Sequence, residues 1–346
     1  LLDFYLKMNL PKIIKITILF AVIVCIAGVI WVVQKQLQPR KFSGIKEAVR
    51  IGIARESLAA LAIIAEDQKF FLQEGLDTTI KHYDSGKLAL TGMTASEVNL
   101  ATVADTPIVF SSFEREDFSI IATIGSSDNE PRIIARKDKG IQKPGDLRGK
   151  RIATQKGSAV HFFLHRFLIK NGLSEKNVVL SFKNPDELVS ALANGDIDAF
   201  SMREPYISKT KKLIGDNAIV FSEPRLYLKT FNLIALKSFI KDKPQAVNGI
   251  LRALIRAEEF ARKYPDQAIK IVSNTLGVSE SETADVWAEI NIGVSLNQSL
   301  LLSFEDEARW AIRNKLTHKT KVPNYLNFIY PDGLEAVKPE AVTIIR

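Results

Sequence analysis

The sequence predicts an α/β fold, because strand-like and helix-like patterns alternate along most of its 346 residues. From Val49 onward, short apolar runs bounded by turn residues alternate with longer segments whose apolar residues follow helical spacing. Serine, threonine, aspartate or glycine stands at many junctions between the two patterns. Such an alternation is typical of largely parallel sheets whose strands are joined by helices.

The segment before this region differs in composition. Residues 16–33 form an uncharged apolar run of 18 residues, which as a helix would be about 27 Å long and would nearly match a bilayer core. The run ends in bulky Ile30 and Val33, whereas a cleaved signal peptide ends in small residues. We therefore expect a transmembrane signal anchor at 16–33, between an N-terminal tail at 1–15 and a polar tether at 34–48. Basic residues flank the run on both sides, so its orientation stays open, as do cleavage and lipidation.

The charge distribution argues against a nucleic-acid partner. The formal net charge is +8, but the first 48 residues hold seven of the 47 Lys and Arg and only two of the 39 Asp and Glu. The remainder is therefore close to neutral, without a basic run interleaved with aromatic residues. The single cysteine, Cys25, lies in the apolar run, so the rest of the chain has no thiol for a disulfide, a metal or a nucleophile.

The first part of the α/β region contains strands that alternate with helices. The expected strands are VRIGIAR, TTIKHYD, LATVA, SIIATIGS and PRIIARKD, and helices are expected at 57–73, 86–94 and 105–111. The last of these strands, at 131–138, is a candidate crossover into a second lobe.

The most informative stretch is residues 144–205, which includes a strand, a turn and a helix at residues 150–172. The strand runs into Gly157-Ser158, and the residues that follow are apolar at helical spacing until Asn171-Gly172. Ser158 is expected to cap this helix, whose first backbone N–H groups lack partners within the helix. Such an end can bind an anion or a polar ligand, or it can be an ordinary capped turn. The turn taken alone leaves both possibilities open.

The rest of the chain is predicted to return to the first lobe. The segment LYLKTFNLIAL reads as the return strand, and helices are expected at 244–262, 265–275, 279–289 and 304–315. One lobe inserted within another accounts for this order. We expect lobe 1 at 49–135 and 226–346, the latter including a C-terminal tail, and lobe 2 at 136–225.

Four turns carry small hydroxyl or acidic residues at the expected carboxyl ends of strands. They contain Ser57, Asp84-Ser85-Gly86, Asp105-Thr106 and Gly157-Ser158. Ligands of open α/β sheets bind at this edge, and clefts between domains are common ligand sites. We therefore expect the four turns to face one cleft between the lobes.

Other kinds of site have weaker support. His161 and His165 are four residues apart, a spacing that can hold a metal, but neither an HExxH motif nor a visible third ligand accompanies them. We expect packing or surface roles for them and no metal, although His161 also lies near enough to the helix start to contact a ligand. No GxSxG elbow surrounds Ser158. No GxxxxGK[ST] phosphate loop occurs in the sequence either.

Five stretches carry a resemblance to a known family. They are YDSGKLALTGM, ATVADTPIVF, DLRGKRIATQKGSAVHFFLHRFLIKNGL, ELVSALANGDIDAFSMREP and GLEAVKPEAVTI. In this order the chain resembles the substrate-binding proteins of the nitrate/sulfonate/taurine class of ABC importers, a group that includes binders of pyrimidine precursors. The resemblance spans nearly all of residues 49–345. It implies a two-lobed periplasmic-binding-protein fold of type II, each lobe a mixed sheet flanked by helices, which closes over one small molecule.

The resemblance also implies which residues line the pocket. They are Ser57, Ser85, Asp105, Thr106, Gly157, Ser158, Ala159, Arg203 and Glu204, to which the helix position adds His161. Arg203 stands where relatives often have an aromatic residue. If it faces the cleft, its planar fork of donors suits a carboxylate, sulfonate or phosphate. If it pairs with Glu204 or faces solvent, this indication is lost.

The function that the resemblance implies is capture of a small sulfonate-, nitrate- or taurine-like molecule and its delivery to an ABC permease with its ATPase. We expect a monomer that uses no cofactor and is not an enzyme. It would be anchored in the cell membrane, with the binding domain in the periplasm or outside the cell. Two alternatives stay open: a protein of the same fold that binds pyrimidine precursors or makes pyrimidines, and a ligand-sensing ectodomain.

Overall fold

The computed structural model describes residues 44 and 46–345, which belong to one compact unit, Ser43–Arg346. The predicted tail at 1–15, the predicted signal anchor at 16–33 and most of the tether at 34–48 lie outside the described residues. None of the helices among the described residues combines the length and the apolar character of a membrane span.

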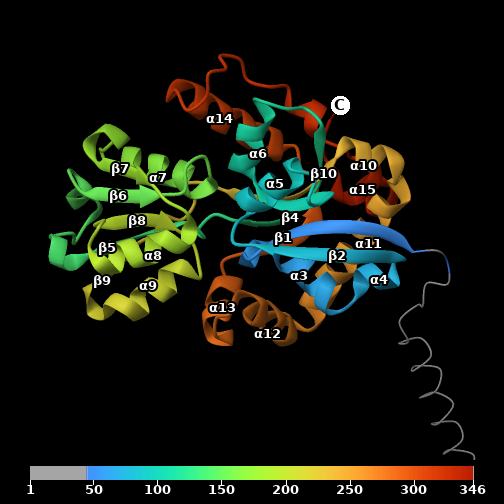
Figure 1. Cartoon of the computed structure of the whole chain (residues 1–346), viewed down its shortest axis with the longest axis horizontal. Coiled ribbons are helices and arrows are strands. Elements are labelled where there is room, and N and C mark those ends of the chain that lie inside the picture. The colour runs from blue at the N-terminus through green and yellow to red at the C-terminus, as the bar shows by residue number, and fades with distance from the viewer. Residues whose placement is uncertain (1–43, 45, 346) are drawn as a thin grey trace, which may run out of the picture. The chain divides into compact units, whose positions relative to one another are not determined.

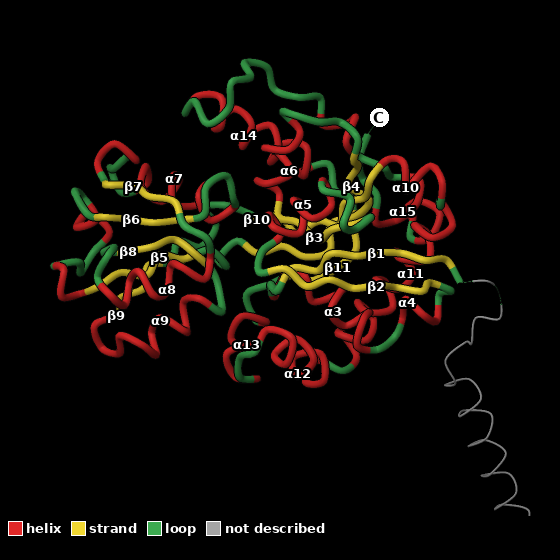
Figure 2. Tube along the Cα trace, in the orientation of Figure 1, coloured by secondary structure: helices red, strands yellow, loops and turns green. Residues whose placement is uncertain are grey.

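The described residues form two mixed β-sheets, each flanked by helices (Figures 1 and 2). We call the six-stranded sheet with its helices lobe 1 and the five-stranded sheet with its helices lobe 2. The strand order in lobe 1 is β11-β4-β10-β3-β1-β2. These strands are β1 (Glu47–Ala54), β2 (Leu76–Tyr83), β3 (Leu100–Ala104), β4 (Phe118–Ser127), β10 (Lys229–Leu236) and β11 (Asn291–Ser295).

Only part of the lobe 1 sheet is parallel. Strand β1 pairs in parallel with β2 and β3, whereas β10 is antiparallel to β3 and β4, and β11 is antiparallel to β4. The prediction of largely parallel sheets is therefore wrong for this half of the sheet. The reason is the path of the chain, which leaves lobe 1 after β4 and returns into β10, so the two neighbouring strands run in opposite directions.

Lobe 2 has the strand order β7-β6-β8-β5-β9. Its strands are β5 (Arg132–Arg136), β6 (Arg151–Thr154), β7 (Val179–Phe182), β8 (Ala199–Met202) and β9 (Ala218–Phe221). The strands β7, β6 and β8 are parallel, and β5 is antiparallel to β8 and β9. The candidate crossover strand, β5, thus pairs within the lobe 2 sheet.

Helices cover both faces of each sheet (Figure 1). In lobe 1, α5 and α6 lie on one side and α3 and α11 on the other; in lobe 2, α7 lies opposite α8 and α9. The lobe 1 helices are α3 (Ala60–Asp67), α4 (Phe70–Gln73), α5 (Gly86–Thr94), α6 (Asp105–Ser112), α10 (Lys237–Asp242), α11 (Pro244–Lys263), α12 (Pro265–Leu276), α13 (Glu280–Trp287), α14 (Ser299–Arg313) and α15 (Asp332–Val337). The lobe 2 helices are α7 (Ala159–Lys170), α8 (Pro185–Asn194) and α9 (Tyr206–Ile214).

The helix predicted at 57–73 is broken in two places. It starts as a short 3-10 helix at Ser57–Ala59, continues as α3, and stops at Lys69, which has a left-handed backbone with φ of 57°. The following turn, α4, buries Phe71. The break falls within the polar residues 66–69, which separate the apolar runs of α3 and α4.

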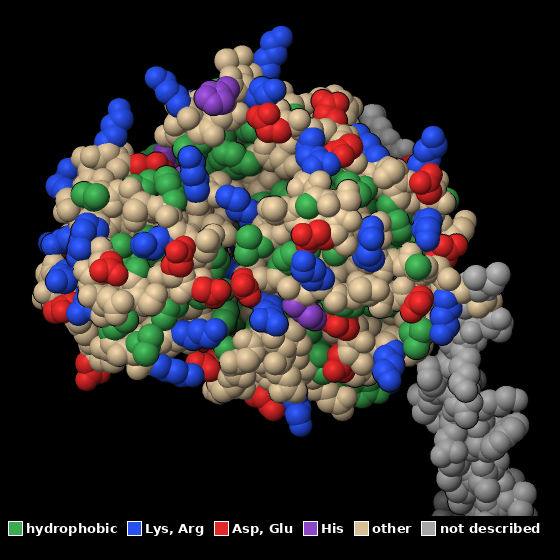
Figure 3. All heavy atoms as spheres, in the orientation of Figure 1, with side chains coloured by type: hydrophobic (Ala, Val, Ile, Leu, Met, Phe, Trp, Pro, Cys, Tyr) green, Lys and Arg blue, Asp and Glu red, His purple; other side chains and the backbone are tan. Residues whose placement is uncertain are grey.

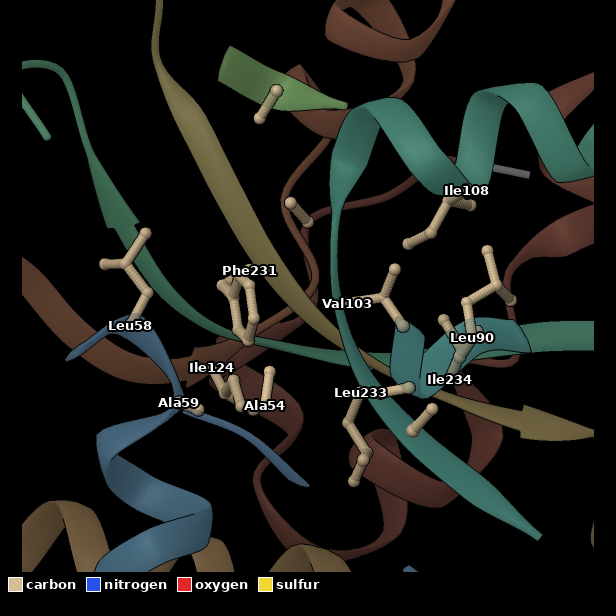
Figure 4. Close-up of a cluster of buried hydrophobic side chains, with 14 of the residues drawn as sticks. Ala54, Leu58, Ala59, Leu90, Val103, Ile108, Ile124, Phe231, Leu233 and Ile234 are labelled. Atoms are coloured by element: carbon tan, nitrogen blue, oxygen red, sulfur yellow. The ribbon is translucent and has the colours of Figure 1, made fainter. Parts of the chain in front are cut away.

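The core of lobe 1 forms where the sheet meets these helices. Figure 4 shows buried side chains of β3, β4 and β10 clustered with those of α5 and α6. Gly125 of β4 also lies in this region. A Cβ at this position would lie 2.7 Å from the carbonyl oxygen of Leu58, so a side chain would not fit there. That close approach holds the start of the first helix against the sheet, next to the boundary with lobe 2.

Two segments, residues 128–131 and 222–228, join the lobes. They run side by side, since the amide of Arg225 donates to the carbonyl oxygen of Asp128 at 3.1 Å. The paired crossing segments place the ends of strands from both sheets around one junction.

Over the face drawn in Figure 3, Lys and Arg side chains are interspersed with Asp and Glu side chains.

Candidate ligand-binding site

A cavity of about 20 Å³ lies at the junction of the two lobes, where strands from both sheets end. This volume holds roughly one water molecule, so the lobes are closed onto each other here. Lobe 1 contributes Glu56, Ser85, Gly86, Lys87, Ala104, Pro107 and Lys229 to its walls. Lobe 2 contributes Gln155, Ser158, Ala159, Val160 and Arg203.

A larger cavity, of about 490 Å³, belongs to lobe 1 alone. Its charged wall residues include Glu258 and Lys338, whose Nζ lies 2.9 Å from Glu258 Oε2. Because these two charges satisfy each other and lobe 2 contributes no lining residue, size alone does not make this cavity the better ligand site. We take the small junction cavity as the candidate site.

Helix α5 points its N-terminus into the junction, but its first amide is already occupied. The amide of Gly86 donates to Glu56 Oε1 at 3.0 Å. The N-cap residue, Ser85, accepts from the amide of Leu88 at 3.3 Å and from Gln155 Nε2 of lobe 2 at 3.2 Å. A carboxylate of the protein therefore sits at the positive end of this helix, which favours an anion.

Helix α7 offers a second N-terminus, from lobe 2. Ser158 donates its hydroxyl to the carbonyl oxygen of Gln155 at 2.6 Å and gives no side-chain cap to the helix. The amides of Ala159 and Val160 have no hydrogen-bond partner among the described residues. Free N–H groups and the positive end of the helix dipole make this end the one available to an anion.

Arg203 follows β8 and crosses from lobe 2 to lobe 1. It is only 2% exposed, and its Nη2 donates to the carbonyl oxygen of Asp84 at 3.0 Å. Its Nε lies 2.8 Å from Glu56 Oε2, which is an ion-pair distance. The Nε–H bond is not aligned with that oxygen, so this donor makes no hydrogen bond to it. Arg203 therefore faces the cleft and pairs with Glu56, not with Glu204. The carboxylate of Glu204 instead accepts from the amide of Ser208 at 3.0 Å.

Four buried charges form a continuous chain through the junction. Lys229 Nζ lies 2.9 Å from Glu56 Oε2 and 2.5 Å from Glu130 Oε2, and Arg203 contacts the same Glu56 carboxylate. Glu130 lies in one crossing segment, and Lys229 follows the other directly. This row of four charges therefore connects both crossing segments to the strand ends of both lobes.

The pKa values of these groups reflect their mutual pairing. Burial alone would raise the pKa of Glu56, but the charges of Arg203 and Lys229 outweigh it and hold the pKa below its usual value. Burial would likewise lower the pKa of Lys229, yet Glu130 and Glu56 raise it. Burial raises the pKa of Glu130, since Lys229 offsets the effect only in part. Glu56 and Lys229 are thus charged at neutral pH.

Asp105 has a structural role in the described chain. Its Oδ2 accepts from the amide of Thr230 at 2.8 Å, its Oδ1 accepts from the amide of Thr106 at 2.9 Å, and the hydroxyl of Tyr227 also donates to Oδ1. Both oxygens are therefore satisfied by the protein. Asp105 fixes the start of α6 to β10 and to the second crossing segment, and neither it nor Thr106 lines the cavity.

A second buried carboxyl, Glu307 of α14, lies near Asp105. Burial and the charge of Asp105 raise its pKa well above the usual value. Neither oxygen has a well-aligned hydrogen bond among the described residues, although the side chain of Thr106 interacts with it. We infer that Glu307 is protonated and neutral at neutral pH, because a buried unpaired carboxylate would be costly.

His161 is fully buried behind the cavity wall. Its Nδ1 accepts from the amide of Gly157 at 3.3 Å, and its ring packs edge-on against Trp310 of α14. Its Nε2 lies 3.5 Å from Glu175, which also contacts His165 at 3.2 Å. Across residues 46–345, no three His, Cys, Asp or Glu side chains are arranged to hold a metal ion. The structure therefore gives His161 a packing role.

The predicted site residues fall into three groups. Ser85, Ser158, Ala159 and Arg203 line the junction cavity. Gly157 lines a neighbouring chamber, and Glu204 lies outside the cavity. Ser57, Asp105, Thr106 and His161 are buried without lining it.

Sequence reasoning missed the lining residues with charged or amide side chains, which are Glu56, Lys87, Gln155 and Lys229. Lys229 could have been found from the sequence, because it lies within an apolar strand pattern. A lysine buried in such a strand almost always pairs with an acidic group. Glu56 directly precedes the predicted Ser57 turn, but its sequence neighbours do not indicate its contact with Lys229, which is 173 residues away.

The comparisons with known proteins identify the family of the chain and several of its relatives. A family model described as NMT1/THI5 like matches residues 59–268. The chain belongs to this family. It is 27% identical over 276 residues to a putative aliphatic sulfonates-binding protein of Bacillus subtilis (strain 168), a match that covers 78% of this chain and 82% of the relative. It is 24% identical over 234 residues to the taurine-binding periplasmic protein of Escherichia coli (strain K12), covering 66% and 71%.

Solved structures agree on the fold of this NMT1/THI5-like chain. The alkanesulfonate-binding protein SsuA from Xanthomonas axonopodis pv. citri, bound to MOPS, matches with a TM-score of 0.73 and 19% identity, over 84% of this chain and all of that one. The desulfurization enzyme DSZB also matches, with a TM-score of 0.59 and 15% identity, over 84% and 98%. The two mixed sheets flanked by helices therefore match a periplasmic-binding-protein fold, and the family resemblance seen in the sequence is confirmed.

Replacing Lys229 by methionine (Lys229→Met) tests the buried chain of charges. We expect a loss of about 3–5 kcal/mol in the free energy of unfolding, because Glu56 and Glu130 would remain buried without their shared cation. Urea unfolding of the full chain, followed by circular dichroism, measures the loss. The matched control is Lys243→Met, which removes an exposed pair with Glu47 and should cost no more than about 1 kcal/mol. Equal small losses in both variants would contradict the role given to Lys229.

Replacing Glu307 by glutamine (Glu307→Gln) tests the neutral buried carboxyl. The pKa of Glu307 is raised in the folded state, so the folded chain keeps a proton that the unfolded chain has lost above about pH 4.5. Wild-type stability should therefore fall relative to Glu307→Gln as the pH rises from 5 to 9, by up to about 1.4 kcal/mol per pH unit. Unfolding curves at several pH values measure the difference. Glu305→Gln, on the same helix but partly exposed, should not reproduce it, and a pH-independent difference for Glu307→Gln would contradict the assignment.

Proposed function

We propose that this protein is the solute-binding component of an ABC importer and that it holds a small sulfonate monoanion between its lobes. The observation that carries the proposal is the convergence of the α5 and α7 N-termini, one from each lobe, with buried Arg203 on one cavity. Relatives named for binding aliphatic sulfonates and taurine support the ligand class.

The free donors of the cavity favour an anionic head group that accepts several hydrogen bonds. The amides of Ala159 and Val160 and the Nε–H of Arg203 are donors without aligned acceptors among the described residues. A sulfonate has three acceptor oxygens, so it can take all three donors at once. Charge-assisted hydrogen bonds of this kind are among the strongest that a protein makes.

The charge balance of the cavity favours a single negative charge. The chain of Glu130, Lys229, Glu56 and Arg203 contains two acidic and two basic groups. Lys87 adds one positive charge to the cavity wall, with its ammonium donating to the carbonyl oxygen of Lys156. A monoanion would neutralise this charge, whereas a dianion would leave an uncompensated buried charge, which is costly.

Ligand binding and lobe closure are coupled in this proposal. The hydrogen bond between Ser85 and Gln155 and the ion pair between Glu56 and Arg203 both cross from one lobe to the other. A ligand held by the lobe 2 donors and also by Lys87 of lobe 1 would favour the form in which the lobes meet around it and shift the population toward that form. The cavity of about 20 Å³ would have to widen to hold a sulfonate. The crossing segments at 128–131 and 222–228 would act as the hinge.

The partner and location follow from the same proposal. Closed, loaded protein would dock on a permease driven by an ATPase, and the predicted segment at 16–33 would keep the protein on the outer face of the membrane. The alternatives of pyrimidine chemistry and of sensing use the same fold.

Isothermal titration of the full chain with ethanesulfonate, sulfate and nitrate tests the head-group assignment. We expect saturable binding of the sulfonate, and at least tenfold weaker binding by Arg203→Gln, because one charged donor and one cross-lobe contact are lost. The control is Arg148→Gln, an exposed arginine of lobe 2, which should bind like the wild type. Absence of heat with every sulfonate, or an unchanged affinity in Arg203→Gln, would overturn the proposal.

A further inference from the structure

The carboxylate of Glu56 is bound within the junction as an anionic ligand would be. Glu56 is only 3% exposed, and its Oε1 accepts from the amide of Gly86, at the N-terminus of α5, at 3.0 Å. Its Oε2 lies 2.8 Å from Arg203 Nε and 2.9 Å from Lys229 Nζ. A helix N-terminus, a guanidinium and an ammonium are groups with which proteins bind carboxylates and phosphates. The junction therefore already holds one anion, which belongs to the protein itself.

The partners of Glu56 are divided between the two lobes. Gly86 and Lys229 lie in lobe 1, as Glu56 does, whereas Arg203 lies in lobe 2 directly after β8. When the lobes separate, Glu56 keeps its contacts within lobe 1 and loses only its contact with Arg203. Arg203 is therefore the partner for which an incoming anion competes with Glu56.

The junction cavity is too small for a second anionic group beside the Glu56 carboxylate. Glu56 and Arg203 both line the cavity, and its volume is about 20 Å³, which is room for roughly one water molecule. A sulfonate group, with its sulfur and oxygens, is larger than that. An anion that reaches Arg203 therefore has to displace Glu56 from it or hold the lobes further apart.

The charge of Glu56 also repels an incoming anion. Burial raises the pKa of Glu56, but the charges of Arg203 and Lys229 outweigh burial and hold the pKa below its usual value. The carboxylate is therefore charged at neutral pH. Buried charges are screened less than exposed ones. The repulsion also grows with the charge of the ligand, so a dianion meets about twice the repulsion of a monoanion.

We propose that Glu56 is an internal anion that competes with the ligand for Arg203 and makes the site select monoanions over dianions. Glu56 is then a specificity-determining residue whose removal strengthens anion binding instead of weakening it. This inference rests on the proposed function, because it concerns the same cavity. It applies to the charge of the head group, whatever organic group is attached.

Titration of Glu56→Gln with sulfate and with ethanesulfonate tests this competition. The two probes carry similar sulfur–oxygen groups, but sulfate is a dianion and ethanesulfonate a monoanion. We expect the full-length variant to bind sulfate about tenfold more tightly than the wild type, because the repulsion by Glu56 is removed. Ethanesulfonate should gain only about threefold, since a monoanion meets half of that repulsion. Isothermal titration measures both changes.

Further variants separate the charge of Glu56 from effects on folding. Glu56→Ser removes the same charge with a smaller side chain and should show the same gains, which guards against a folding defect in either variant. Glu56→Asp keeps a charge beside Lys229 and should keep the wild-type preference. The control, Glu74→Gln, removes a lobe 1 carboxylate that pairs with Arg252 and Arg256 outside the cavity. This control should leave both affinities unchanged, and circular dichroism checks the folding of each variant.

The possible outcomes distinguish this inference from the proposed function. If neither the wild type nor any Glu56 variant binds either anion, the proposed function fails and the internal anion fails with it. If the wild type binds ethanesulfonate and both Glu56→Gln and Glu56→Ser bind the two anions more weakly, the competition is wrong while the proposed function stands. Equal gains for sulfate and ethanesulfonate would overturn the selection by charge.

Discussion

The position of the two lobes depends on the buried contact between Lys229 and its two carboxylates, Glu56 and Glu130. Three charged groups removed from water would oppose folding if they were unpaired. Here the groups lie 2.5–2.9 Å apart, and Arg203 extends the pairing into lobe 2. Glu130 belongs to one crossing segment and Lys229 adjoins the other, so the contacts that stabilise the junction also connect the two crossing segments.

This constraint explains why the two helix N-termini of the cavity are not equivalent. Glu56 can pair with Lys229 and Arg203 only from the place where it also accepts from the amide of Gly86. The positive end of α5 is thereby neutralised from within. The N-terminus of α7 keeps free amides at Ala159 and Val160, so the asymmetry gives an incoming anion one defined end to bind.

The sequence allowed most strands of lobe 1, most helices and the helix start at Ser158 to be predicted, because each depends on neighbours along the chain. The strands β7, β8, β9 and β11 were not predicted. Arg203 was singled out by the family resemblance, and its orientation depended on Glu56, which lies far away in the sequence. Asp105 looked like a ligand residue by the same local rule that identified Ser158. It proved to be satisfied by Tyr227, and only the three-dimensional structure brings these side chains together. Strand direction beyond β3 depended on the path between lobes and could not be predicted locally.

The central claim is that an anion binds between the lobes at the N-terminus of α7, and a crystal structure of the full chain with 3-bromopropanesulfonate tests it most directly. Anomalous scattering from bromine and sulfur locates both ends of the ligand without ambiguity. We predict the sulfonate within hydrogen-bond distance of the Ala159 amide and Arg203. Density for the ligand in the lobe 1 cavity beside Glu258 and Lys338, with the junction empty, would contradict it.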